Sequence, residues 1–229
     1  MDYQKNIKYF KSNDKHFYIG IGILAVGAIL FVLAMFLTLW FLPYQGTISV
    51  ALIGAGAGVA FIPRSLRSNS RDLDDAVARA TEKYAEKTAQ AVGLEDSLIR
   101  NIKPVVVGDY TYEENALMRR AKDARRVRTS VYTATAMLFT KTGIYLAQKK
   151  ISLIQDLVTE SDAEFVYSDL DGVSVVMEEK TFEDGTKAKI AFIVIMAGGK
   201  EAMRIPTAKG SAADKLCDDI NHMISLSKK

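Results

Sequence analysis

Hydrophobic and polar positions divide the chain into two unlike parts. Residues 17–63 contain no charged side chain, so all Lys, Arg, Asp and Glu lie outside that stretch. Two apolar runs, residues 17–42 and 47–62, are separated by a short uncharged link that contains Pro43 and Gly46. As a helix, the first run reaches about 39 Å, against a hydrocarbon core of roughly 30 Å. The pattern predicts a two-helix transmembrane hairpin over residues 17–63.

Basic residues flank this hairpin on both sides and are absent from its link. Four lysines precede it and three arginines follow it: Lys5, Lys8, Lys11, Lys15, Arg64, Arg67 and Arg71. Because cytoplasmic loops carry the excess of Lys and Arg, we expect a multi-pass protein of the plasma membrane with both termini cytoplasmic. Trp40 and Tyr44 then fall at the outer interface. A cleaved signal peptide is the alternative, but the first run exceeds the usual apolar segment and residues 39–42 make a poor cleavage site.

The second apolar run is rich in small residues. Gly54 and Gly58 have the G-x-x-x-G spacing that lets helix backbones approach closely. This predicts packing against the first helix or against another copy of the chain, although small residues could also be background composition here. Neither run contains an acidic, basic or histidine side chain, which argues against transport by a single copy.

A helical linker is expected over residues 64–103. Ser70 suits a helix N-cap, and Gly93 suits a stop after Val92. The apolar stripe between them is narrow, which favours a solvated spacer helix, with weak self-association as the alternative. A second short helix is predicted at residues 95–102, before Pro104.

Beyond Pro104 the pattern becomes strand-like. About seven short segments rich in β-branched and aromatic residues are separated by turn signals, and residues 211–226 then form an amphipathic helix. Its apolar stripe contains Leu216, Ile220, Met223 and Ile224. This order predicts an α+β domain in which antiparallel strands form a strongly bent sheet and the helix supplies the missing core face.

Two segments of this domain resemble a known family. LFTKTGIYL (residues 138–146) and FVYSDLDGVSVV (residues 165–176) are similar to motifs of bacterial pleckstrin-homology-like and GRAM domains. With the terminal helix, the resemblance covers residues 104–226. It implies a pleckstrin-homology-like antiparallel partial β-barrel capped by a C-terminal α-helix. Residues 111–128 depart from the family pattern, because they look more helical than a first hairpin should.

That same departure carries the densest positive charge of a chain whose net charge is only +3. Six basic residues are opposed only by Asp123: Arg119, Arg120, Lys122, Arg125, Arg126 and Arg128. The resemblance implies that such residues meet lipid phosphates, with Arg126 and Arg128 as the basic pair. The alternative from the residues alone is a solvated basic helix or a protein-docking face. No aromatic side chains interleave the cluster, so we expect no nucleic-acid partner.

Candidate chemistry is sparse elsewhere. His16 and His222 have no second ligand at metal spacing, and Cys217 falls near the apolar stripe of the last helix, where burial is expected. Acidic residues between Asp156 and Asp184 do not match an EF-hand loop. We therefore expect no catalytic site, metal or cofactor, and hence no enzyme.

The expected organisation is a cytoplasmic tail (1–16), a transmembrane hairpin (17–63), a helical linker (64–103) and a pleckstrin-homology-like domain (104–229). The expected function is a membrane-anchored, non-enzymatic binding module that docks anionic lipid headgroups or a partner protein. The alternative is an accessory subunit of a larger membrane complex. Partners are then membrane lipids and a protein, or a second copy joined through the hairpin.

Overall fold

The chain divides into two units, residues 2–69 and residues 70–229, and each is described on its own. The structure is a computed structural model, and it describes residues 1–12, 15–36, 45–99, 102–113, 115–120, 127–181 and 187–229. The α+β class expected from the sequence is confirmed, with helices and antiparallel sheets in separate parts of the chain.

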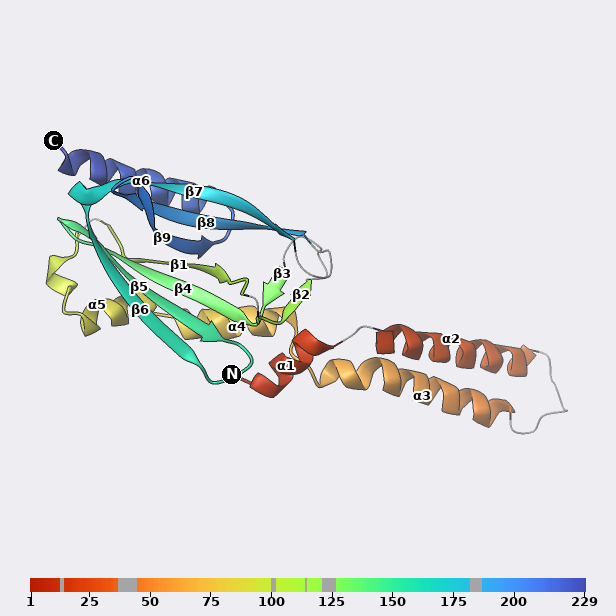
Figure 1. Cartoon of the computed structure of the whole chain (residues 1–229). Coiled ribbons are helices and arrows are strands. Elements are labelled where there is room, and N and C mark those ends of the chain that lie inside the picture. The colour runs from red at the N-terminus through yellow and green to blue at the C-terminus, as the bar shows by residue number, and fades with distance from the viewer. Residues whose placement is uncertain (13–14, 37–44, 100–101, 114, 121–126, 182–186) are drawn as a thin grey trace. The chain divides into compact units, whose positions relative to one another are not determined.

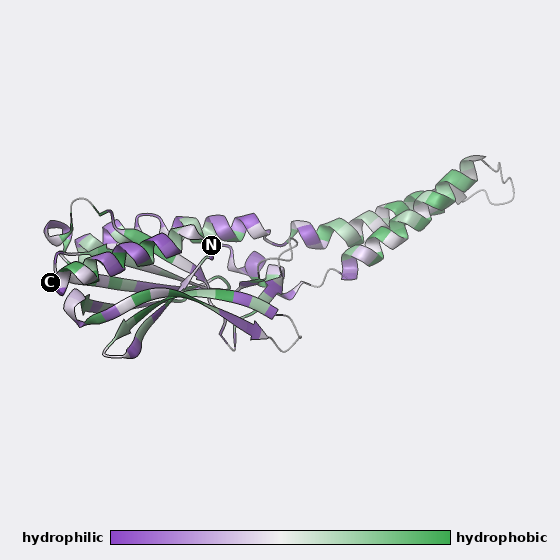
Figure 2. Ribbon diagram, turned by 90° about the horizontal axis from the view of Figure 1, so that it is seen from above, coloured by the Kyte–Doolittle hydropathy of each residue, from purple (hydrophilic) through white to green (hydrophobic). Residues whose placement is uncertain are grey.

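The first unit consists of α1 (Tyr3–Lys11), α2 (Lys15–Phe36) and α3 (Gln45–Ser65) (Figure 1). The predicted tail thus contains a helix, whose N-cap Asp2 accepts a hydrogen bond of 3.1 Å from the Lys5 amide. Two helices, α2 and a segment that includes α3, are long and apolar enough to cross a membrane by length and composition. Their hydrophobic colouring stands out in Figure 2.

α2 and α3 pack as an antiparallel pair through glycine. A Cβ atom added to Gly20 would lie 2.5 Å from the backbone nitrogen of Ala60, and one added to Gly56 would lie 2.5 Å from that of Leu24. Further along, Gly27 opposes Ile53. Because no larger residue fits at these positions, the two helix backbones touch. The helical hairpin is therefore present, while Trp40 and Tyr44 lie outside the described residues.

The predicted linker helix is broken in two. α4 (Ser70–Thr81) and α5 (Tyr84–Ala91) are separated at Lys83, whose φ of 55° is left-handed, and Gly93 with φ 66° follows the end of α5 as expected. The prediction of a solvated spacer is wrong for α5. Its small face packs on the sheet, through contacts among Tyr84, Ala85, Ala89, Ala136, Leu138 and Ala147. Of the predicted second helix, the described part contains only a 3-10 turn, Glu95–Ser97.

Nine strands occur among the described residues, rather than about seven. A four-stranded antiparallel sheet has the order β1-β4-β5-β6, and a three-stranded one has the order β7-β8-β9. The bounds are β1 (Val105–Tyr110), β4 (Val131–Phe139), β5 (Gly143–Ser152), β6 (Val158–Val166), β7 (Leu170–Thr181), β8 (Lys187–Ala197) and β9 (Lys200–Thr207). Among the described residues, no strand pairing joins these two sheets, so they do not form a closed barrel.

The C-terminal helix α6 (Ser211–Ser227) completes the core, as its periodicity predicts. Cys217, Ile220 and Ile224 are buried in one cluster with strand residues such as Ile193 and Ile205, while Leu216 and Met223 pack at its margin. Burial raises the pKa of the Cys217 thiol to about 11, so this cysteine is an inert core residue.

α6 also satisfies the outer edge of β7. The Asn221 side chain accepts a 2.8 Å hydrogen bond from the Val173 amide and donates a 2.7 Å hydrogen bond to the Val173 carbonyl. The Lys228 ammonium donates to the Leu170 carbonyl at 2.7 Å. An open strand edge invites pairing with other chains, and here a side-chain amide imitates the missing strand.

Replacing Asn221 tests this edge. We expect Asn221→Ala to lower the free energy of unfolding by about 2 kcal/mol, because two hydrogen bonds are lost. Asn221→Asp should cost at least as much, since a carboxylate cannot donate to the Val173 carbonyl. Chemical unfolding of the full chain in detergent gives the free energies, and hydrogen exchange reports the Val173 amide. Ser225→Ala, on the exposed side of α6, is the control. Unchanged exchange at Val173 in Asn221→Ala would contradict this role.

Candidate functional site

The predicted binding residues lie in the connection between β1 and β4, residues 111–130, which we call the excursion. It contains two short antiparallel strands, β2 (Met118–Arg120) and β3 (Val127–Thr129), in which Arg119 lies opposite Arg128. We call residues 118–129 the basic hairpin. The sequence left open whether residues 111–128 are helix or strand, and in the described part residues 118–120 and 127–128 are strand.

Hydrogen bonds close the base of the basic hairpin. The Leu117 amide donates to Ser130 Oγ at 2.9 Å, and the Ser130 amide donates to the Leu117 carbonyl at 2.8 Å. The Thr111 amide donates to the Val131 carbonyl at 2.9 Å. The excursion therefore leaves and rejoins the sheet at one point, with β4 starting directly after Ser130.

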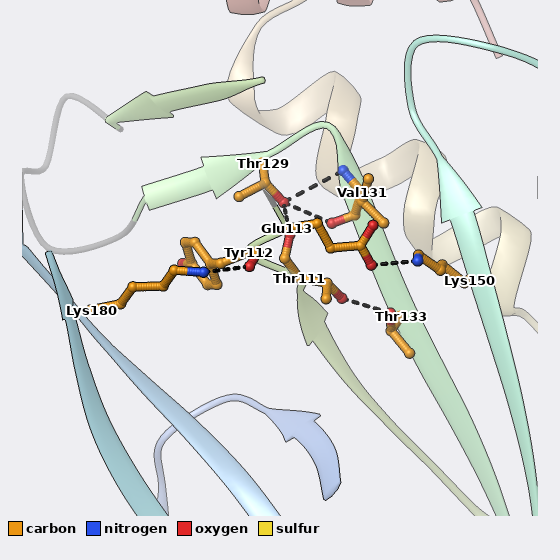
Figure 3. Close-up of polar contacts among 8 residues, drawn as sticks. All are labelled: Thr111, Tyr112, Glu113, Thr129, Val131, Thr133, Lys150 and Lys180. Atoms are coloured by element: carbon orange, nitrogen blue, oxygen red, sulfur yellow. Dashed lines mark hydrogen bonds and ion pairs between the residues drawn. The ribbon is translucent and has the colours of Figure 1, made fainter. Parts of the chain in front are cut away.

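Buried threonines hold the same junction (Figure 3). Thr129 is fully buried, and its hydroxyl lies 2.7 Å from the Thr111 carbonyl oxygen and 2.8 Å from that of Val131. The hydroxyls of Thr111 and Thr133 are 2.6 Å apart. These short side chains replace ladder hydrogen bonds where the chain bends, which explains a polar cluster inside a β-rich core.

Two lysines from other strands converge on the start of the excursion (Figure 3). The Lys180 ammonium, near the end of β7, donates to the Tyr112 carbonyl at 2.7 Å, and the Tyr112 hydroxyl donates to the Val127 carbonyl at 2.7 Å. Lys150 of β5 forms an ion pair with Glu113. Both lysines thus fasten the excursion to the two sheets.

Arg128 has a structural partner on the linker helix. Its Nε and Nη2 atoms lie 3.2 and 2.8 Å from the two carboxylate oxygens of Asp74 on α4. The Tyr110 hydroxyl donates to Asp74 at 2.7 Å, and the arginine is only 8% exposed. Such a two-pronged ion pair leaves little of Arg128 for a ligand. Burial, with the hydrogen bond to Asp74, raises the pKa of Tyr110 well above its usual value.

The other predicted site residues have mixed outcomes. Arg119 and Arg120 lie on β2, with the Arg120 side chain outside the described part, and Lys122, Arg125 and Arg126 lie outside it altogether. The structure therefore brings Arg119 and Arg128 together by strand register, and Arg128 is buried. Asp74 was missed as a partner, because an acidic residue near a helix start is explained equally well by the helix dipole.

Gly54 and Gly58 do not mediate the contact between α2 and α3. A Cβ atom on Gly54 would meet nothing within 4 Å, and one on Gly58 would meet only Ile62 of its own helix. Gly20, Gly27 and Gly56 occupy the contact instead. Packing of Gly54 and Gly58 on another copy stays a prediction.

No group of three or more His, Cys, Asp or Glu that could hold a metal ion occurs in the part of the chain that the structure describes. No family model, curated protein or solved structure matches the chain.

A double-mutant cycle tests the Asp74–Arg128 pair. We expect Asp74→Asn to lower the free energy of unfolding by about 2 kcal/mol, because it leaves a buried guanidinium with a neutral partner. Arg128→Gln should cost a similar amount, and the double variant less than the sum, which gives a coupling energy of roughly 1–2 kcal/mol. Chemical unfolding of the full chain measures all three. Asp75→Asn, an exposed neighbour on the same helix, is the matched control. Additive losses, or an equal loss in the control, would rule the pair out as an anchor.

Proposed function

We propose that this chain is a membrane-anchored, non-enzymatic binding module whose β domain docks on anionic lipid headgroups through the basic hairpin. The ion pair between Arg128 and Asp74 carries the proposal. It ties the base of the basic hairpin to α4, the first helix after the apolar pair. The basic hairpin is therefore held by an ion pair to α4, the helix that follows the proposed membrane anchor in the sequence.

The apolar pair suits a membrane rather than a protein interior. Large apolar side chains along both helices are more than half exposed, among them Ile19, Ile29, Ile48 and Ile62. A soluble protein rarely leaves a contiguous apolar surface of this size in water. The distribution of Lys and Arg supports a cytoplasmic location for both termini, at the plasma membrane.

The link between the apolar pair and the β domain is short. α3 ends at Ser65 and α4 begins at Ser70, so five peptide steps of at most about 3.6 Å limit the separation of these two residues to roughly 18 Å. Anionic lipids of a cytoplasmic leaflet attract basic side chains with about 1 kcal/mol each near the surface. By sequence the basic hairpin also contains Arg120, Lys122, Arg125 and Arg126, and we assign this attraction to them.

The strand order supports a pleckstrin-homology-like fold for this domain. Its two matching motifs fall on β4–β5 and on β6–β7, and antiparallel strands in chain order are followed by a helix that completes the core. The family assignment rests on those motifs together with this order.

A partner protein is the second candidate, and one surface favours it. A groove of about 470 Å³ lies between the outer strand β1 and α6, lined by residues such as Val105, Val107 and Leu216. β1 is paired on one side only within its sheet, so an extended apolar segment of another protein could lie along it. This arrangement suits an accessory subunit of a membrane complex.

Topology is testable with one epitope tag before Met1 and another after Lys229. We expect added protease to remove both tags in inverted membrane vesicles and neither tag in right-side-out vesicles, because the basic flanks stay cytoplasmic. Detergent-treated vesicles, in which both tags must be cleaved, are the control. Cleavage of either tag in intact right-side-out vesicles would contradict the proposed orientation.

Lipid docking is testable by trypsin cleavage of the full chain in nanodiscs. We expect cleavage after Lys122, Arg125 and Arg126 to slow by at least about tenfold when neutral lipid is replaced by a lipid mixture rich in phosphatidylglycerol. High salt should reverse the effect, because it screens surface charge. Cleavage after Lys141, in the exposed β4–β5 turn, is the internal control. Equal rates in neutral and anionic discs would refute lipid docking, and salt-resistant protection found only in native membranes would favour the protein partner.

A further inference from the structure

The first unit contains a cationic pocket where α2 begins and α3 ends. It has a volume of about 230 Å³, and residues from the end of α1, the start of α2 and the end of α3 line it, chiefly Lys11, Ser12, His16, Phe17, Arg64 and Arg67. It lies one turn beyond the close contact between Gly20 and Ala60, and Ala60 belongs to its wall.

Basic side chains make up the charged part of the described lining of the cationic pocket. Among the described residues, which leave out 13 and 14, its lining includes two arginines and a lysine and no acidic side chain. Basic side chains gathered in one pocket repel each other. An anion bound among them attracts each of them and offsets this repulsion, so its binding is favourable.

Protein contacts hold these cations in place. The Arg64 guanidinium lies over the Phe17 ring, 3.6 Å from its centroid. Arg67 donates to the hydroxyl of Ser12, which in turn donates to the Tyr9 carbonyl at 3.2 Å. α1, α2 and α3 are thus joined around the pocket, so its basic groups are positioned before a ligand arrives.

An apolar hollow continues along the same helix face. It has a volume of about 350 Å³ and is lined by Ile19, Gly22, Ile23, Val26 and Leu52. His16, Ile19, Ile23 and Val26 follow one another at steps of three, four and three residues, which places them on one face of α2. A cationic pocket and an apolar hollow therefore succeed each other along the axis of the hairpin.

We propose that the cationic pocket binds the phosphate of an anionic phospholipid, one acyl chain of which lies in the apolar hollow. The inference rests on the proposed insertion of α2 and α3 in a membrane. Basic pockets between helices on the cytoplasmic side of a membrane suit anionic headgroups. A soluble phosphate would use the cations but would leave the hollow unoccupied, which is why a lipid is the better fit.

Lipid retention by the purified full chain tests this site. Native mass spectrometry of protein released from nanodiscs, at increasing mole fractions of phosphatidylglycerol in phosphatidylcholine, measures how much of each lipid stays bound. The double variant K11Q/R64Q should retain phosphatidylglycerol about 30-fold less well, since two basic contacts are lost. K5Q/K8Q removes two charges from α1 outside the pocket and should change retention by no more than about threefold. K11R/R64K keeps both charges and should bind anionic lipid.

Further variants and competitors separate the alternatives. Val26→Trp fills the hollow and leaves every cation in place, so it should weaken retention of phosphatidylglycerol. Displacement of the lipid by millimolar inorganic phosphate would overturn the lipid as ligand. Equal retention by K11Q/R64Q and K5Q/K8Q would overturn the pocket. Trypsin protection of the basic hairpin, measured in the same nanodiscs, tests the proposed function separately. If phosphatidylglycerol is retained but the basic hairpin is not protected, lipid docking by the hairpin is refuted and the pocket is not. If the basic hairpin is protected but phosphatidylglycerol is not retained, the pocket is refuted and docking is not.

Discussion

A guanidinium taken out of water has to be compensated, and this requirement shapes the second unit. Arg128 is buried beside Tyr110, where an isolated cation would cost several kcal/mol. Asp74 supplies the compensating carboxylate from a helix that precedes the first strand by some thirty residues. α4 is therefore part of the β domain's electrostatic balance, and the unit begins at Ser70 rather than at the first strand. Any ligand that moves the basic hairpin acts on the same ion pair and so on α4.

The contrast between local and long-range information explains what the sequence could predict. The apolar helices, the terminal helix and most strands follow from periodicities that each segment carries itself. The packing of α5 does not, because its alanines are too small to mark a core face until Ala136 and Ala147 of the sheet are placed opposite them. The strand character of the basic hairpin also escaped, since three-residue strands are defined by their partners. The pairing of Asp74 with Arg128, 54 residues apart, leaves no local pattern at all.

The glycine contacts show the same limit within one helix. A G-x-x-x-G spacing indicates that a helix can approach another closely. Which of its residues face the partner depends on the second helix. Gly56 lies midway between Gly54 and Gly58, and it is this residue that meets α2, because Gly20 and Leu24 lie opposite it. On α2 the matching glycines are seven residues apart, at Gly20 and Gly27, so the spacing motif there passes unnoticed. Small residues predicted the kind of contact, and the partner decided which of them make it.

The two groups of basic residues differ in how their charge is balanced, and this difference bears on their roles. Arg128 is balanced inside the protein, by a carboxylate held at hydrogen-bonding distance and by a tyrosine that orients it. The described residues that line the cationic pocket include Lys11 and Arg64 and no carboxylate. A cation balanced within the chain, as Arg128 is, stabilises the fold and gains little from a ligand. Lys11 and Arg64 can gain from an external anion, which under the proposed membrane insertion is a phospholipid. We infer that Arg128 serves internal pairing, whereas Arg64 suits pairing with a lipid phosphate.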